Sequence, residues 1–308
     1  MYCNAFTISI LGSNAAKPSA KRNPSGQLLQ YANFYALIDC GEGTQQQLLK
    51  YGLKTSRITH IFISHLHGDH FLGLMPLLDS YALSNRTSDL HIFSPSANLK
   101  VYFEMHTQIS QAHYPYHIEF HVVNPNETAI IFKNDLLTVR TIPLKHTAPC
   151  CGYLFTEKQL ERKFLIEFQE EYAIHFSKIP DIKKGADYVC PNGQIVPNEQ
   201  ITLPPPPSRS YAYCSDTSFY PSIASAIKGV NLLYHETTYL EELQTRAEQR
   251  GHSTTTDAAK IAKQAQAKQL LIGHFSTAYN DLAPFLAEAT NIFSNTALAI
   301  DGQTFTIE

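Results

Sequence analysis

The stretch "FISHLHGDHFLGL" spans residues 62–74 and decides how the fold is interpreted. It crowds His65, His67, Asp69 and His70 together directly after an apolar run. Polar groups that are buried need partners, so this turn is either a solvated surface loop or a binding site. A solvated loop gives no reason for these residue types at this spacing between apolar flanks. The turn is therefore interpreted as a metal-binding site.

The spacing within the turn suits two neighbouring metal ions. Catalytic zinc takes imidazole nitrogen and carboxylate oxygen, with three or four protein ligands. His65 and His67 lie two residues apart on a chain that leaves a strand, so their side chains can point the same way. Gly68 allows a sharp reversal, which turns Asp69 and His70 toward an adjacent position. The turn can thus offer two ligands to each ion.

Further ligands are expected at the ends of other strands. The candidates are His146, Asp216 and His274, each of which follows an extended run. Ligands of α/β proteins gather at the carboxyl ends of strands. Alone, His146 could equally be a hydrogen-bonded structural histidine, and Asp216 could be a helix N-cap. His235 is interpreted as structural.

The rest of the chain predicts sheets covered by helices. Alternating patterns predict strands at 6–11, 31–39, 59–65, 90–95, 210–216, 230–236 and 269–275, and helices at 43–53, 73–84, 219–227, 254–267 and 282–293. Residues 117–123, 129–134 and 136–144 are expected to form an antiparallel meander. Residues 157–207 break this rhythm: they are polar, end near "LPPPPSR", and are interpreted as an insertion that projects from the body. The fold class is α/β.

Composition narrows the setting. The 308 residues are 44% hydrophobic and 17% charged, with a net charge of −3, so a nucleic-acid partner needs a local basic patch. No apolar stretch is long enough to span a membrane and no signal peptide is recognised, so a cytoplasmic protein is expected. The cysteines show no CxxC pair and are expected to be reduced thiols. They are Cys3, Cys40, Cys150, Cys151, Cys190 and Cys214.

Besides "HLHGDH", the chain carries a series of motifs in order along its whole length. They are "LGSNAAKPSAKRN" (11–23), "IDCGEGTQQQLL" (38–49), "LKHTAPCCGYLF" (144–155), "YCSDT" (213–217), "YHETTY" (234–239), "GHSTTTDAAKIAK" (251–263) and "LLIGHFSTAY" (270–279). "HLHGDH" resembles the signature of the metallo-β-lactamase superfamily, and the whole series resembles the motifs of its ribonuclease Z family. The resemblance implies an αββα sandwich, with two mixed sheets flanked by helices. It implies one domain over 1–308 with a shortened substrate-binding arm at 157–207.

The resemblance also implies the metal ligands. His65, His67 and His146 would bind one zinc ion, while Asp69, His70 and His274 would bind a second. Asp216 would bridge the two. The set of His and Asp ligands also suits Mn²⁺ or Fe²⁺. Asp39 is either an acceptor that orients a ligand imidazole or a structural group of the "DCGEG" turn.

The implied activity is endonucleolytic removal of the 3′ trailer from tRNA precursors. The tRNA would keep a 3′-hydroxyl and the trailer a 5′-phosphate. Asp69 is the proton acceptor of the family. His252, held protonated by Glu236, would donate a proton to the leaving oxygen. Ser253 or a following threonine could cap a helix whose exposed N–H groups favour phosphate, which would put His252 beside the scissile group. Alternatively, Ser253 and Thr254 merely cap a helix and His252 is a surface residue.

The expected partners are a tRNA precursor and a second copy of the chain in a homodimer. Candidate RNA contacts are Lys17, Lys21, Arg22, Lys54, Arg57, Lys183 and Lys184. The chain departs from the family in lacking the Gly-Pro motif of the arm, and in carrying Ala278 where the family usually has Arg. Two other interpretations remain: a hydrolase of small phosphodiesters or esters on the same fold, and a non-catalytic RNA-binding protein.

Overall fold

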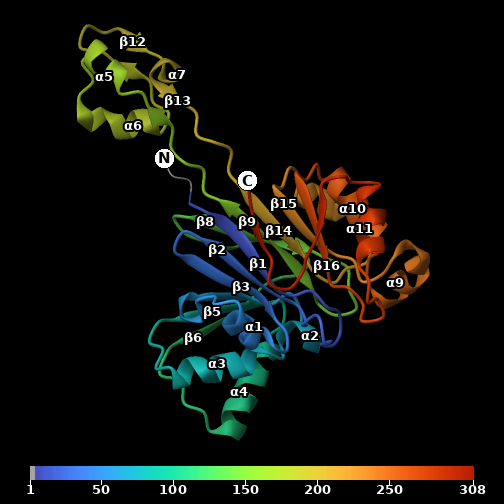
Figure 1. Cartoon of the computed structure of the whole chain (residues 1–308). Helices are drawn as coiled ribbons and strands as arrows, with labels where there is room; N and C mark the ends of the chain where they lie inside the picture. Colours follow the sequence, from blue (N-terminus) through green and yellow to red (C-terminus); the bar gives the residue numbers. More distant parts are fainter. Residues whose placement is uncertain (1–3) are drawn as a thin grey trace. The chain divides into compact units, whose positions relative to one another are not determined.

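The computed structural model describes residues 4–308, and these divide into two compact units. One comprises the chain up to Thr156 together with Arg209–Glu308, and the other is Glu157–Ser208. The larger unit contains two seven-stranded sheets (Figure 1). Within the described residues, no helix is long and apolar enough to cross a membrane.

The first sheet carries the histidine-rich turn at the end of β4. Its strand order is β18-β1-β2-β3-β4-β5-β6. The strands are β1 (Phe6–Gly12), β2 (Gly26–Tyr31), β3 (Phe34–Cys40), β4 (His60–Phe62), β5 (Leu90–Ser94), β6 (Ile118–Val122) and β18 (Thr304–Thr306). The strands β3 to β6 are parallel and the others antiparallel, so the sheet is mixed.

The second sheet is mixed as well. Its order is β17-β16-β15-β14-β9-β8-β7. The strands are β7 (Ile130–Lys133), β8 (Leu137–Pro143), β9 (Cys151–Glu157), β14 (Ser210–Cys214), β15 (Leu232–Glu236), β16 (Gln269–Gly273) and β17 (Thr296–Leu298). The predicted antiparallel meander is wrong in one respect, because β6 pairs in parallel with β5 in the first sheet. Only β7 and β8 form the expected hairpin.

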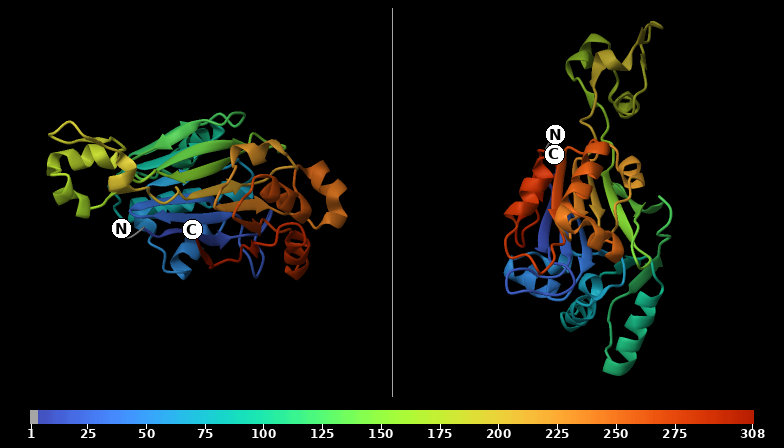
Figure 2. Two further views of the ribbon diagram at one scale, coloured as in Figure 1. Left: turned by 90° about the horizontal axis from the view of Figure 1, so that it is seen from above. Right: turned by 90° about the vertical axis from the view of Figure 1, so that its right-hand side faces the viewer.

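Alternating side chains build the layers. In β3 and β4, Ile38 and Phe62 face the core between the sheets, whereas Leu37 and Ile61 face the outer core. Helices cover both outer faces (Figures 1 and 2). They are α1 (Thr44–Lys50), α2 (Gly68–Phe71), α3 (Leu74–Leu83) and α4 (Asn98–Ser110) after strands of the first sheet. The helices that follow strands of the second sheet along the chain are α8 (Ser222–Ala226), α9 (Gln244–Arg250), α10 (Thr255–Gln264) and α11 (Ala283–Thr290). The αββα sandwich is confirmed.

The short helical turns η1 (Thr55–Arg57) and η3 (Glu241–Leu243) complete the larger unit. The described cysteines Cys40, Cys150, Cys151, Cys190 and Cys214 are free and buried, as expected, and Cys3 lies outside the described residues.

The smaller unit has its own apolar core. Its elements are β10 (Lys163–Phe164), α5 (Glu167–Glu171), η2 (Phe176–Lys178), α6 (Ile179–Lys183), β11 (Tyr188–Val189), β12 (Ile195–Val196), α7 (Asn198–Ile201) and β13 (Thr202–Leu203). Buried Ile182, Val196 and Ile201 pack together within it. Two short antiparallel pairs, β10–β13 and β11–β12, close the unit.

Candidate metal centre and catalytic residues

The histidine-rich turn is held against the end of β3 by close backbone packing. A Cβ at Gly41 would clash with the carbonyl oxygen of Asp69, and a Cβ at Gly73 would clash with that of Gly41. The helix α2 starts at Gly68 directly after His67, which leaves Asp69 and His70 in its first turn. Close approach at these glycines fixes where the ligands of the turn point.

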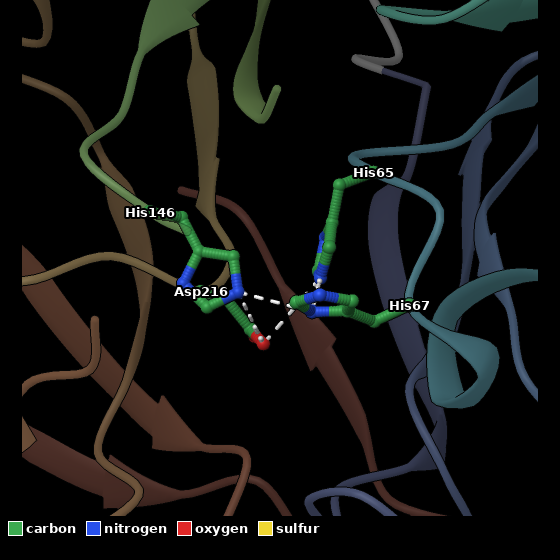
Figure 3. A group of neighbouring side chains, drawn as sticks. All are labelled: His65, His67, His146 and Asp216. Atoms are coloured by element: carbon green, nitrogen blue, oxygen red, sulfur yellow. Dashed lines mark hydrogen bonds and ion pairs between the residues drawn. The ribbon is translucent and has the colours of Figure 1, made fainter. Parts of the chain in front are cut away.

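A first group of ligand atoms joins both sheets. Nδ1 of His67 lies 3.0 Å from Nε2 of His65 and 3.1 Å from Nε2 of His146. Oδ2 of Asp216 lies 3.6 Å from Nε2 of His65 and 3.7 Å from Nε2 of His146. Figure 3 shows these four side chains pointing toward one another, with His146 and Asp216 coming from the second sheet. The four atoms surround one small volume.

A second group lies beside the first. Oδ2 of Asp69 is 3.5 Å from Nε2 of His70 and 3.3 Å from Nε2 of His274. Oδ1 of Asp216 is 3.4 Å from the His70 nitrogen and 3.3 Å from the His274 nitrogen. The two oxygens of Asp216 thus face different groups. All seven residues expected from the sequence come together here, and Asp216 is common to both groups.

Hydrogen bonds alone do not satisfy this arrangement. Nδ1 of His146 donates to the carbonyl oxygen of Gly251 at 2.7 Å, so its Nε2 has a lone pair facing His67. Nδ1 of His70 bonds Asp39 Oδ2 at 2.8 Å. Nε2 of His70 and Oδ1 of Asp216 are buried and have no hydrogen-bond partner among the described residues. Converging lone pairs with fixed outer nitrogens suit divalent metal ions, for which nitrogen and oxygen ligands of this kind are typical.

Nearby histidines lower the pKa values of the two carboxyls among the candidate ligands. Burial opposes ionisation of Asp216, but His274 and His70 outweigh it and hold the pKa of that carboxyl well below its usual value. The pKa of Asp69 is lowered too, since His70 and His274 overcome the effect of burial. Asp39 and His274 take left-handed φ angles of 55° and 60°. Strained backbone of this kind costs about 1–3 kcal/mol per residue and clusters at functional sites.

His252, which is partly buried, pairs with the fully buried Glu236 beside the candidate metal ligands. Nδ1 of His252 lies 2.9 Å from Glu236 Oε1. Burial disfavours the imidazolium, yet Glu236 raises the pKa of His252 to about 9. His252 borders a cavity of about 260 Å³, which Asp69, Asp216 and His274 also line. The ring can therefore reach a group bound at the metal ligands while it carries a proton.

Two sequence expectations, one on the start of α10 and one on Arg22, need correction. Thr254 caps α10 in a capping box with Asp257, as considered, but Ser253, Thr254 and Thr255 are fully buried. The helix N-terminus is therefore not open to phosphate.

Arg22, expected to contact RNA, is 8% exposed, and its guanidinium bonds Asn14 and the carbonyl of Tyr279. It stabilises the first loop instead.

The structure shows the bonding partners of Asp39 and His235. Asp39 accepts bonds from Ser64 N at 2.7 Å and from the Tyr213 hydroxyl at 2.6 Å, besides its contact with His70, so it both holds the turn and orients the imidazole of His70. His235 is buried with Nδ1 on the carbonyl of Glu236 and lies in neither ligand group.

Sequence reasoning missed two contacts. The hydroxyl of Thr238 lies 2.9 Å from His274 Nδ1 and 2.7 Å from Glu236 Oε2, so it links the metal ligands to the pair of His252 and Glu236. The backbone N–H of Ala16 donates to Asp69 Oδ2 at 2.7 Å. The contact of Thr238 is signalled by the place of this residue in "HETT". The contact of Ala16 is made by a backbone N–H, so no residue type in the sequence signals it.

Comparisons with known proteins show which families this chain is similar to. The family model of the anti-Pycsar protein Apyc1 matches residues 6–167. Ribonuclease Z of Parabacteroides distasonis is 41% identical over 302 residues, covering 98% of this chain and 99% of that protein. Ribonuclease Z of Bacteroides fragilis is 42% identical, covering 96% of both chains.

Solved structures give the same picture. The short form of human tRNase Z superposes with a TM-score of 0.71 at 25% identity, covering 98% of this chain and 99% of that one. The Bacillus subtilis metallo-β-lactamase-fold protein YhfI has a TM-score of 0.68 at 19% identity, covering 98% and 99%, and supports the fold alone. The chain therefore belongs to the Apyc1 family over residues 6–167 and, over nearly its whole length, to the ribonuclease Z family.

Proposed function

We propose that this chain removes the 3′ trailer from tRNA precursors, leaving a 3′-hydroxyl on the tRNA and a 5′-phosphate on the trailer. Membership of the ribonuclease Z family makes it a metal-dependent endoribonuclease. One observation carries the proposal: the two carboxylate oxygens of Asp216 face two separate groups of ligand atoms. A pair of ions sharing one carboxylate is an arrangement that suits phosphodiester displacement.

Two zinc ions per chain are proposed, with Mn²⁺ or Fe²⁺ as chemically equivalent occupants. His65, His67 and His146 would hold one ion, Asp69, His70 and His274 the other, and Asp216 both. When bound, the ions would supply positive charge that polarises the scissile phosphate and acidifies water. The protein supplies a fixed set of ligands, because the outer nitrogens of His70 and His146 are hydrogen-bonded.

Asp69 is proposed to accept the proton of the attacking water. Its lowered pKa keeps the carboxylate ionised at neutral pH, so it can accept a hydrogen bond from water and align it. The N–H of Ala16 fixes the orientation of this carboxylate. The same side chain is thus proposed to serve as ligand and proton acceptor.

His252 is proposed to protonate the leaving ribose 3′ oxygen. With a pKa raised to about 9, the ring is protonated at neutral pH. Glu236 holds it through Nδ1, which leaves Nε2 to face the substrate. Glu236 is itself held by the backbone N–H groups of Thr217 and Ser253, at 3.1 and 3.0 Å. This rigid pair keeps the proton donor in place.

Residues 157–207 are proposed to form a substrate-binding arm inserted in a single metallo-β-lactamase-like domain. The arm carries more acidic than basic residues overall, but three of its lysines gather around one carboxyl. Lys158, Lys183 and Lys184 all act on the carboxyl of Glu161, which Lys183 contacts at 2.9 Å. Such a local basic group is what a chain with net charge −3 needs for contact with phosphates.

A homodimer in the cytoplasm is proposed as the working form. The helix α4 exposes Val101, Met105 and Ile109 at helical spacing, with exposed fractions of 50%, 55% and 80%. An apolar stripe of this kind is suited to contact with a second copy. The free thiols among the described residues fit a reducing compartment.

Cleavage of a 3′-extended tRNA precursor by the purified protein tests the function. We expect a single cut near the discriminator base that leaves a 3′-hydroxyl, and no cut by Asp69→Ala. The exposed Asp89, which lies in neither ligand group, provides the control variant Asp89→Ala. A protein that hydrolyses bis(p-nitrophenyl) phosphate but not the precursor would refute the tRNA assignment and favour a hydrolase of small phosphodiesters.

A further inference from the structure

A second cluster of metal-binding side chains lies outside the catalytic centre, on the neighbouring strands β5 and β6. His91, Glu119 and His121 bring one ligand atom each to a common point. His91 is the direct neighbour of Glu119 in the parallel register, and Phe93 that of His121. Residues two apart on a strand share a face, so the three side chains point the same way.

The separations between these ligand atoms match a coordination site. Nδ1 of His91 lies 3.2 Å from His121 Nε2 and 3.2 Å from Glu119 Oε2. The His121 nitrogen lies 3.8 Å from the same oxygen. Ligands about 2.0–2.1 Å from a tetrahedral zinc ion are about 3.3 Å apart, so the three atoms stand where three corners of such a site would be.

The catalytic centre provides an internal standard. In its first group, His67 lies 3.0 and 3.1 Å from the other two imidazole nitrogens and Asp216 lies 3.6 and 3.7 Å from His65 and His146, a range close to that of the β5–β6 cluster. The side chains of His91 and His121 are each 31% exposed and that of Glu119 is 48% exposed, so an ion can enter from solvent. Apolar packing fixes the rings, since His121 stacks on Phe93 at 4.4 Å between centroids.

We propose that His91, Glu119 and His121 bind a third divalent transition-metal ion, with water completing its coordination, and that this ion ties strand β6 to β5. Two imidazoles and one carboxylate are a ligand set that zinc and iron both accept. Strand β6 stands at the end of the sheet order and so has a pairing strand on one side only. An ion across β5 and β6 therefore stabilises an edge strand of the sheet.

The third ion is held more weakly than the catalytic pair. In the catalytic centre, the outer nitrogens of His70 and His146 are fixed by Asp39 and by a carbonyl. Within residues 4–308, no hydrogen bond fixes the outer nitrogens of His91 and His121. Loss of such outer partners lowers metal affinity about 10- to 100-fold in metalloproteins, so a chelator will remove this ion first.

The test is metal content of the full-length, tag-free chain, equilibrated at buffered free Zn²⁺ and measured by mass spectrometry. We expect three zinc ions in the wild type and two in both His121→Ala and Glu119→Gln. The control is His106→Ala, because His106 pairs with Asp79 at 3.0 Å with a side chain 26% exposed, but lies in none of the clusters. It should retain three.

The conservative Glu119→Gln variant guards against misfolding, and its circular dichroism after chelation should match that of the chelated wild type. Cleavage of RNA should be unchanged in both variants, because these residues lie outside the catalytic groups. A wild type that binds only two ions, or a Glu119→Gln variant that keeps the wild-type zinc content, would overturn the proposal. So would a third ion that survives longer in chelator than the catalytic pair.

Discussion

The candidate site of the larger unit buries its charged groups, whereas the lysine cluster of the smaller unit is exposed. In the larger unit Asp216, His70 and Glu236 are 2%, 0% and 0% exposed. In the smaller unit the paired side chains of Lys183 and Glu161 are 35% and 48% exposed. Buried charges without partners are costly, whereas exposed pairs contribute about 0–1 kcal/mol. We therefore expect changes at the buried site of the larger unit to alter the chemistry, and changes at the exposed lysines of the smaller unit to alter only binding.

The largest effect is expected from Asp216→Ala. The variant removes the carboxylate that both ligand groups share, so both catalytic ions should be lost. We expect cleavage to fall more than about a thousand-fold, because ions of this kind contribute several kcal/mol at about tenfold per 1.4 kcal/mol. Precursor cleavage and zinc content measure it, with Asp89→Ala as control. An Asp216→Ala variant that keeps both ions and its activity would contradict the expected difference between the two units.

The next effect in size is that of His252→Ala. A proton donor to the leaving oxygen contributes about 10²- to 10⁴-fold, so single-turnover cleavage should fall by that factor. His252 also lies close enough to Asp216 and His274 to be a ligand itself. Zinc content separates the two roles, since a proton donor can be removed while both ions stay bound. Loss of one ion would show that His252 is a metal ligand instead. The exposed His113 provides the control variant His113→Ala.

A smaller effect is expected from Asp39→Asn, which keeps the shape of the side chain but removes its charge. Asp39 orients His70 through Nδ1, so metal affinity should fall by about 10- to 100-fold. Competition with a chromophoric chelator measures this. Asp301→Asn is the matched control, because Asp301 is also largely buried and accepts bonds from Ser13 and Asn23 but touches no ligand. Equal affinities for both variants would contradict the role of Asp39.

The grouping of the candidate ligands could be predicted from the sequence because each follows a strand that has a clear apolar pattern. His274 comes directly after β16, and Asp216 closely follows β14. Strand ends meet at one edge of a sheet, so the pattern of elements already brings these residues together. The bond between Ala16 and Asp69 could not be predicted, because it is made by a backbone N–H.

The parts of the fold that were missed have signals that are weak or point away from the core. The helix α4 buries only Leu99, and its apolar stripe of Val101, Met105 and Ile109 is exposed, so that stripe does not mark a helix packed against a core. The placement of β6 beside β5 depends on a pairing between distant segments, which the alternation of residues within each strand does not encode. Within the smaller unit the strands are two residues long, too short for any periodic pattern.

The smallest effect is expected in the smaller unit, from the double variant Lys183→Ala/Lys184→Ala. If this unit binds tRNA, KM should rise several-fold while kcat stays unchanged, because the lysines would bind phosphate and not the reacting atoms. Affinity should also depend less steeply on salt, by about one unit of slope for each phosphate that the variant no longer neutralises.

The matched control is Lys100→Ala, since Lys100 forms a similar exposed pair with Glu104 at 3.8 Å but belongs to the larger unit. It should leave KM, kcat and the salt slope at their wild-type values. A fall in kcat in the double variant, with KM unchanged, would show that the smaller unit shapes the reacting geometry as well. The separation of chemistry from binding between the two units would then be wrong, because an exposed lysine pair would be acting on the buried centre.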